Sequence, residues 1–99
     1  MITVDYDRSV PSLCVSGHAG YAEKGSDIVC AAVSALSQAL AKYICENCGG
    51  SAFMDSGVLT VICEDDRAVP CFDLVADGIK TIAKSYPENI LFRVLHCNG

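Results

Sequence analysis

The apolar residues of this sequence change their spacing along the chain, and these changes of period constrain the fold more than any other feature. Ile2, Val4 and Tyr6 alternate with polar residues, which is the period of a half-buried strand. Leu13 and Val15 repeat this alternation after a turn of sequence DRSVP. The two strands are therefore expected to form a hairpin.

From about residue 28 the period lengthens to that of an α-helix. Ser26 or Asp27 can cap this helix, which is expected to end near Asn47 and to be stopped by Gly49 and Gly50. The expected apolar face consists of Val29, Val33, Leu36, Leu40 and Ile44, widened by Ile28, Ala32, Ala35, Ala39 and Tyr43. The opposite, polar face carries Cys30, Ser34, Ser37, Gln38 and Lys42. Cys30 therefore does not stand where this helix would place a core residue.

The second half of the chain predicts a strand over Val58–Cys63, a second helix and a last strand over Ile90–Cys97. Pro70 suits the first turn of the helix, and Pro87 ends it. Its apolar face consists of Phe72, Val75, Ile79, Ile82 and Tyr86, although Gly78 inside it costs about 1 kcal/mol relative to alanine. The predicted order ββαβαβ is typical of an α/β two-layer sandwich, with two helices on one face of a four-stranded mixed sheet.

Length and composition favour one soluble domain. The chain has 99 residues, of which 52% are hydrophobic, but no run approaches the roughly 20 apolar residues that span a membrane. The N-terminus lacks the features of a signal peptide, and seven cysteines are an odd number for a disulfide scaffold. We therefore expect reduced thiols and a cytoplasmic protein without a membrane partner.

The net charge of −5 argues against nucleic acid as a direct ligand. It is compatible with a basic polypeptide partner, and the adjacent Glu64, Asp65 and Asp66 carry part of it. The alternative is that this acidic run only solvates a turn.

His18 and Cys30 are candidates for a catalytic pair. A thiol attacks as the thiolate, which a neighbouring imidazole and the N-terminus of a helix both favour. First-turn amides could also stabilise an oxyanion, and Ser34 lies one turn after Cys30. Asp27 either caps the helix or also orients His18, and a structural cysteine is the simpler alternative for Cys30. Glycines that would let the intervening loop move, or that serve ordinary turns, are Gly17, Gly20 and Gly25.

The string SGHAGYAEKGSDIVCAAVSAL resembles the signature of the ribosomal-processing cysteine protease (Prp) family. The similarity lies in the GHA tripeptide at residues 17–19 and in DIVCAAVS at residues 27–34, and it extends over the chain in length and element order. No position in these two blocks departs from the family pattern.

This resemblance implies that residues 1–99 form a single cysteine protease domain, with Cys30 as nucleophile and His18 as general base. Gly17, Asp27 and Ser34 match supporting positions. The implied substrate is the N-terminal extension of large-subunit ribosomal protein twenty-seven, cut after a short hydrophobic motif that contains phenylalanine. The resemblance also implies a homodimer and a loop that moves as substrate enters. Relatives encoded by bacteriophages make a capsid or scaffold protein the alternative substrate.

Other site chemistries fit the sequence less well. The segment GYAEKGSD lacks the lysine that a phosphate-binding loop places directly after its second glycine. Cys45 and Cys48 in CENC lie at a helix end, where carbonyl groups disfavour a thiolate, and a zinc site would need two further ligands. We therefore expect structural cysteines there, and no metal or cofactor. A non-enzymatic, ribosome-associated dimeric module is the remaining alternative.

Overall fold

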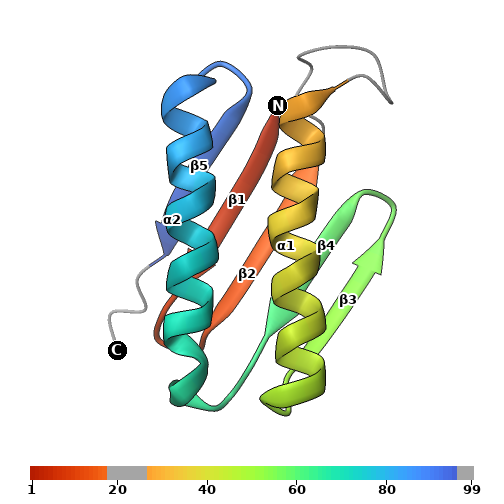
Figure 1. The fold of residues 1–99 in the computed structure, drawn as a ribbon, viewed down its shortest axis with the longest axis vertical. Coiled ribbons are helices and arrows are strands. Elements are labelled where there is room, and N and C mark those ends of the chain that lie inside the picture. Colours follow the sequence, from red (N-terminus) through yellow and green to blue (C-terminus); the bar gives the residue numbers. More distant parts are fainter. Residues whose placement is uncertain (18–26, 96–99) are drawn as a thin grey trace.

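The structure is a computed structural model that describes residues 1–17 and 27–95. Two long helices lie side by side over one face of a single sheet (Figure 1). In chain order the elements are β1 (Ile2–Asp7), β2 (Ser12–Gly17), α1 (Ile28–Asn47), β3 (Ser51–Asp55), β4 (Val58–Ile62), the 3-10 helix η1 (Asp66–Ala68), α2 (Val69–Ser85) and β5 (Ile90–Leu95).

The sheet is mixed, as the sequence predicts. Its strands lie in the order β3-β4-β2-β1-β5. β1 pairs antiparallel with β2, which confirms the predicted hairpin, and parallel with β5. The two-layer arrangement with both helices on one face is also confirmed.

The predicted number of four strands is wrong, because Ser51–Asp55 forms a fifth strand next to β4. The order is therefore ββαββαβ. Ser56 and Gly57 connect the two strands with φ angles of 45° and 81°, the left-handed backbone that a two-residue hairpin turn uses. β3 is an edge strand in which the neighbours Phe53 and Met54 are both exposed, so its residues give no alternating pattern.

The core lies between the sheet and the two helices, and β1 contributes three of its residues. Ile2, Val4 and Tyr6 are almost completely buried, whereas the residues between them face away from the helices. Tyr6 lies opposite Leu13 of β2, and Leu13 lies opposite Val61 of β4. One row of buried side chains thus crosses three strands and supports the helix layer.

The buried stripe of α1 differs from the predicted face at its centre. The buried residues are Val29, Val33, Ser37, Leu40 and Ile44. Ser37 is predicted on the polar face, but its hydroxyl donates to the Val33 carbonyl at 2.8 Å. A serine that is satisfied within its own helix can be buried without an unpaired polar group. Leu36, predicted at the centre of the face, is half-buried at its edge.

The predicted widening of this face is largely wrong. Ile28, Ala35, Ala39 and Tyr43 are exposed, and Ala32 is half-buried. α1 rests on the sheet and has α2 along one side, so only a narrow stripe of its surface is covered.

Contrary to the expectation from the sequence, α1 is long and apolar enough, by length and composition, to cross a membrane. Val29, Val33, Leu40 and Ile44 belong to the hydrophobic core beneath it. The apolar composition of α1 thus includes the residues that hold the two layers together.

The buried face of α2 follows the predicted period. Phe72, Val75 and Ile79 are buried, and Ile82 and Tyr86 are half-buried against the core. The helix carries Pro70 in its first turn and ends before Pro87, as predicted.

Gly78 lies where α2 meets α1. A Cβ atom at Gly78 would lie 3.2 Å from Cδ1 of Leu36, which is closer than ordinary contact. The small residue therefore allows the close approach of the two helices and offsets its low helix propensity.

One strand end differs from its predicted boundary, and another stays a prediction. β4 ends at Ile62, one residue earlier than predicted, and Cys63 follows it as a buried residue. β5 is described as far as Leu95, and the predicted continuation to Cys97 lies outside the described residues.

We expect Gly50→Ala to destabilise the protein more than Gly49→Ala. A Cβ atom at Gly50 would overlap the Ile44 side chain and lie 2.6 Å from the Ile62 carbonyl oxygen. Gly49 has φ +71° but no atom within 4 Å of its added Cβ, so alanine costs only the backbone strain of about 1–2 kcal/mol. Urea unfolding should show an additional loss of at least about 1 kcal/mol for Gly50→Ala. Equal losses for the two variants would contradict crowding at Gly50.

Candidate active site

The candidate site lies where β2 ends and α1 begins. Gly17 is the last residue of β2 and pairs with Ile2, so this end of β2 lies beside the start of β1. α1 begins at the same end of the molecule (Figure 1). His18, Gly20 and Gly25 lie outside the described residues, so the pairing of His18 with Cys30 stays a prediction.

Asp27 caps α1. Its backbone is extended, with φ −80° and ψ 100°, and its carboxylate accepts a hydrogen bond from the Cys30 amide at 2.9 Å. The Asp27 carbonyl accepts a second one from the Ala31 amide at 3.1 Å. Of the two predicted caps, Asp27 thus performs this role, and its side chain is only 8% exposed.

Cys30 is the third residue of α1, and its thiol is not part of a disulfide. Its side chain is half-buried and packs against the edge of the hydrophobic core. The predicted position outside the buried stripe is therefore correct, although one side of the residue touches the core. The first turn of a helix is a position that favours an anion such as a thiolate.

The amide of Cys30 is not a spare hydrogen-bond donor, because it donates to Asp27. The idea that first-turn amides stabilise an oxyanion must therefore depend on donors other than this one while the cap is in place. The sequence alone does not reveal this competition, since it depends on which residue caps the helix.

Ser34 lies one turn after Cys30 and is exposed. Residues four apart on a helix are neighbours on its surface, so its hydroxyl borders the same solvent-facing region as the thiol. The Ser34 carbonyl accepts a hydrogen bond from the Ser37 hydroxyl at 3.3 Å, which leaves the Ser34 side chain outside that interaction.

Gly17 is required by the backbone. Its φ is +87°, and an added Cβ atom would lie 2.5 Å from the Met1 carbonyl oxygen. No other residue type fits this position without moving the start of β1. The glycine of the GHA tripeptide, Gly17, is therefore explained by the backbone conformation at the end of β2.

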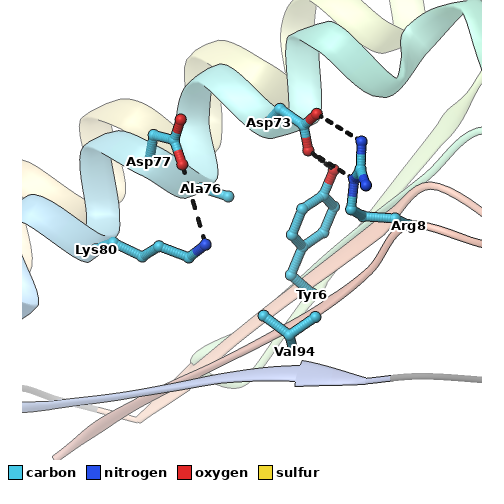
Figure 2. Close-up of a pocket in the computed structure, with 7 residues that line it drawn as sticks. All are labelled: Tyr6, Arg8, Asp73, Ala76, Asp77, Lys80 and Val94. Atoms are coloured by element: carbon cyan, nitrogen blue, oxygen red, sulfur yellow. Dashed lines mark hydrogen bonds and ion pairs between the residues drawn. The ribbon is translucent and has the colours of Figure 1, made fainter.

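A second polar cluster, formed by Tyr6, Arg8 and Asp73, connects β1 to α2 (Figure 2). The Tyr6 hydroxyl donates to Oδ1 of Asp73 at 2.6 Å. The Arg8 guanidinium donates to both carboxylate oxygens of Asp73 at 3.1 Å. The Asp73 carboxylate is thereby held by two side chains from the far end of β1.

These contacts change the protonation behaviour of the cluster. The hydrogen bond from Tyr6, opposed by burial and aided by Arg8, lowers the pKa of Asp73 below its usual value. Burial, together with Asp73, raises the pKa of Tyr6 far above its ordinary value of 10. The two shifts keep the Asp73 carboxylate ionised and the Tyr6 hydroxyl protonated, which is the state that their hydrogen bond requires.

The same pocket also contains Asp77 and Lys80, whose charged groups are 4.0 Å apart. Lys80 lies over the ring of Phe92, with its Nζ 5.3 Å from the ring centre. The pocket includes Tyr6, near the end of β1 that lies away from the start of α1, and its charged side chains are paired. We interpret this pocket as a structural contact between β1 and α2. No local sequence pattern could predict it, because Asp73 is more than 60 positions away from Tyr6 and Arg8.

Within residues 1–17 and 27–95, no three histidine, cysteine, aspartate or glutamate side chains are grouped so that they could hold a metal ion.

Comparison with known proteins identifies the family. The model of the family described as Cysteine protease Prp matches residues 1–91. The ribosomal processing cysteine protease Prp of Mycoplasma pneumoniae is 35% identical over 83 residues, which cover 81% of this chain and 83% of that protein. The corresponding protein of Mycoplasma genitalium is 32% identical, with 80% of this chain and 83% of the relative covered.

A solved structure agrees with this result. The ribosomal processing protease Prp of S. aureus, in complex with a covalently linked product peptide, superposes with a TM-score of 0.83 at 25% identity. The match covers 96% of this chain and all of the other. The fold and the matches define an α/β cysteine protease. The chain belongs to the family of ribosomal-processing cysteine proteases called Prp.

We expect Asp27→Ala to lower the free energy of unfolding by about 1 kcal/mol, because the first turn loses its cap. Asp27→Ser should retain most of this stability, since a hydroxyl oxygen can also cap. Thermal unfolding measures both variants, and an unchanged stability of Asp27→Ala would contradict the role as a cap. Asp27→Asn keeps a capping oxygen but loses the charge, so a loss of activity with retained stability would show a further role in orienting His18.

We expect the stability of the protein to depend on pH through Tyr6 and Asp73. The raised pKa of Tyr6 contributes stability that is present below pH 10 and is lost as the pH rises above it. The lowered pKa of Asp73 contributes stability that is present above about pH 3.8 and is lost as the pH falls below it. Tyr6→Phe should reduce both losses in urea unfolding measured between pH 3 and pH 11.

The matched control is Tyr43→Phe, which removes an exposed hydroxyl from α1. The stability of this variant should depend on pH in the same way as that of the wild-type protein. If Tyr6→Phe and the wild-type protein lost the same amount of stability above pH 10, the alkaline loss would not come from Tyr6.

Proposed function

We propose that this protein is an endopeptidase that uses Cys30 as its nucleophile and His18 as its general base. The observation that carries the proposal is the position of Cys30, in the first turn of a capped helix and at the end of the molecule where β2 leads into His18. A thiol in this position is accessible on one side and fixed by the core on the other. The two sequence blocks that resemble the Prp signature contain both residues.

The reaction follows from the chemistry of the pair. His18 takes the proton of the Cys30 thiol, and the sulfur attacks the scissile carbonyl carbon. The imidazolium then gives its proton to the leaving amine as the C–N bond breaks, which leaves a thioester. His18 next takes a proton from water, and the resulting attack on the thioester releases the new carboxyl terminus and restores the thiol.

We further propose that the substrate is the N-terminal extension of large-subunit ribosomal protein twenty-seven. The Mycoplasma relatives are named as ribosomal processing proteases, and the S. aureus relative has been solved with a substrate peptide. A basic ribosomal protein also suits a protease with a net charge of −5, since opposite charges favour their encounter.

A hydrophobic motif before the cleaved bond would find apolar surface close to the site. Ile28, two residues before Cys30, is exposed, and so is Met1, whose carbonyl lies beside Gly17. Exposed aliphatic side chains of this kind gain stability when a substrate covers them. We propose that they help to accept the hydrophobic residues of the extension.

The homodimer implied by the family resemblance is also part of the proposal. On the helix-free face of the sheet, Phe53 of the edge strand β3 and Val58 of its neighbour β4 are exposed, and so are Leu91 and Leu95 of the other edge strand, β5. Apolar side chains on both edges of this face provide a surface that a second copy could cover.

The direct test is to incubate the purified protein with the extended ribosomal protein and to measure the product by mass spectrometry. The wild-type protein should yield one shortened product with a defined N-terminus. Cys30→Ser and His18→Ala should each reduce the rate by at least about a thousandfold, because each removes one member of the pair. Cys45→Ser is the matched control, since it removes an exposed thiol at the other end of α1 and should leave the rate unchanged.

Processing that persists in Cys30→Ser would rule out this nucleophile. A thiol reagent separates the remaining alternatives: with an active pair, iodoacetamide should modify Cys30 faster than the other six cysteines, and more slowly after His18→Ala. A binding module should show no such difference. An active Cys30 together with an uncut ribosomal protein would retain the protease and reject the substrate.

A further inference from the structure

Cys30 and Leu36 lie on opposite flanks of the buried stripe of α1. They stand three residues before and three residues after Val33, which is almost completely buried, so their side chains point about 60° to either side of it. Leu36 is turned toward α2, because a Cβ atom at Gly78 of α2 would lie 3.2 Å from its Cδ1 atom. The flank that carries Cys30 therefore faces the other half of the sheet, which contains β4 and β3 (Figure 1).

The β3–β4 hairpin has its turn at the end of the sheet that carries the candidate site. Val58, directly after the turn, pairs with Ser16 of β2. Ser16 directly precedes Gly17, the last residue of β2. The turn at Ser56 and Gly57 thus lies toward the end of the molecule at which α1 begins (Figure 1).

A row of apolar side chains crosses the helix side of the sheet at this end. Val4 faces the helices and lies opposite Val15, which in turn lies opposite Leu59. Leu59 lies opposite Met54 of β3. Val4 is completely buried and Leu59 is 8% exposed, whereas Met54 is 66% exposed. The row therefore begins in the core and ends at an exposed methionine on the edge strand.

Met54 has open space beside it. It is the last residue of β3 whose side chain lies on the helix side, and the turn follows it. Among the described residues, no atom lies within 4 Å of a Cβ atom added at Gly57. Ser34, one turn after Cys30 and on the same flank of α1, is also exposed. This flank and the hairpin thus border one solvent-accessible corner, with the thiol on one side and the methionine on the other.

We propose that Met54 determines substrate specificity by binding a large apolar side chain of the peptide that Cys30 attacks. This inference rests on the proposed function, in which the cleaved bond follows a short hydrophobic motif. Methionine suits the role, because its unbranched thioether side chain adapts to aliphatic and aromatic partners alike. The bound side chain would continue the apolar row beyond Leu59, and its burial would remove apolar surface of both partners from water.

The test measures kcat/KM with a synthetic peptide that spans the cleavage site of the extended ribosomal protein. Further peptides replace the large apolar residues of the motif by alanine, one at a time. Met54→Ala should lower kcat/KM for the unchanged peptide roughly tenfold, because most of the apolar contact is lost. For one of the alanine peptides, Met54→Ala should cause almost no further loss, since the contact is already absent. That peptide identifies the side chain that Met54 binds.

Controls separate a binding role from a structural one. Met54→Leu keeps an apolar side chain of similar volume and should retain most of kcat/KM. Leu74→Ala is the matched control, since it removes an exposed apolar side chain from α2 and should leave kcat/KM unchanged for every peptide. Iodoacetamide has no side chain to place against Met54, so it should modify Cys30 at the same rate in Met54→Ala and in the wild-type protein.

An unchanged kcat/KM in Met54→Ala would overturn the inference and leave the protease intact. An equal loss for all peptides, or a slower reaction of Cys30 with iodoacetamide, would also overturn it, because Met54 would then act through the fold. If such a loss came with a changed mass in light scattering, Met54 would belong to a contact with a second copy instead. A wild-type protein that cuts none of the peptides would refute the proposed function, and the role of Met54 with it.

Discussion

Val29 and Val33 are almost completely buried, and their burial fixes the first turns of α1 against the rest of the core. Each contributes roughly 1.5–3 kcal/mol when removed from water. Cys30 stands between them in the sequence, so its side chain lies at the margin of the buried stripe. The Asp27 cap holds the backbone of the same turn. The position of the thiol therefore follows mainly from the packing of its neighbours, and the chemistry of the site depends on the core beneath it.

Different interactions connect the sheet to the helices at its two ends. At one end, Gly17 and Asp27 bring the chain out of β2 and into α1 through backbone geometry and a capping bond. At the other, Tyr6 and Arg8 hold Asp73 of α2, and Tyr6 also stacks on Phe72 with ring centres 6.3 Å apart. The hydroxyl of Tyr6 is shielded from solvent, so this hydrogen bond contributes more than an exposed ion pair would. The side-chain hydrogen bonds between β1 and α2 thus lie at the end of β1 away from the proposed site.

The sequence predicted those parts of the fold that local periodicity controls. Both helices, the β1–β2 hairpin and the buried faces around Val33 and Phe72 were recognisable because a repeated contact with one core produces a repeated pattern. β3 was missed because an exposed edge strand has no buried side to alternate with, and Ser37 was misplaced because its hydroxyl is satisfied inside its own helix. The candidate site was predicted from its motif, whereas the hydrogen bonds to Asp73 depend on tertiary contacts that leave no local signal.

The parallel pairing of β1 with β5 joins segments from opposite ends of the described chain. Parallel strands cannot be linked by a tight turn, and here both helices and three strands intervene. During synthesis, β1 emerges early but must wait for β5 before its second edge is paired. Contacts so distant in sequence form late, because a long loop must close before they are gained. The fold can therefore be completed only after β5 has been translated. Until then, the edge of β1 that pairs with β5 would stay without a partner strand in the nascent chain.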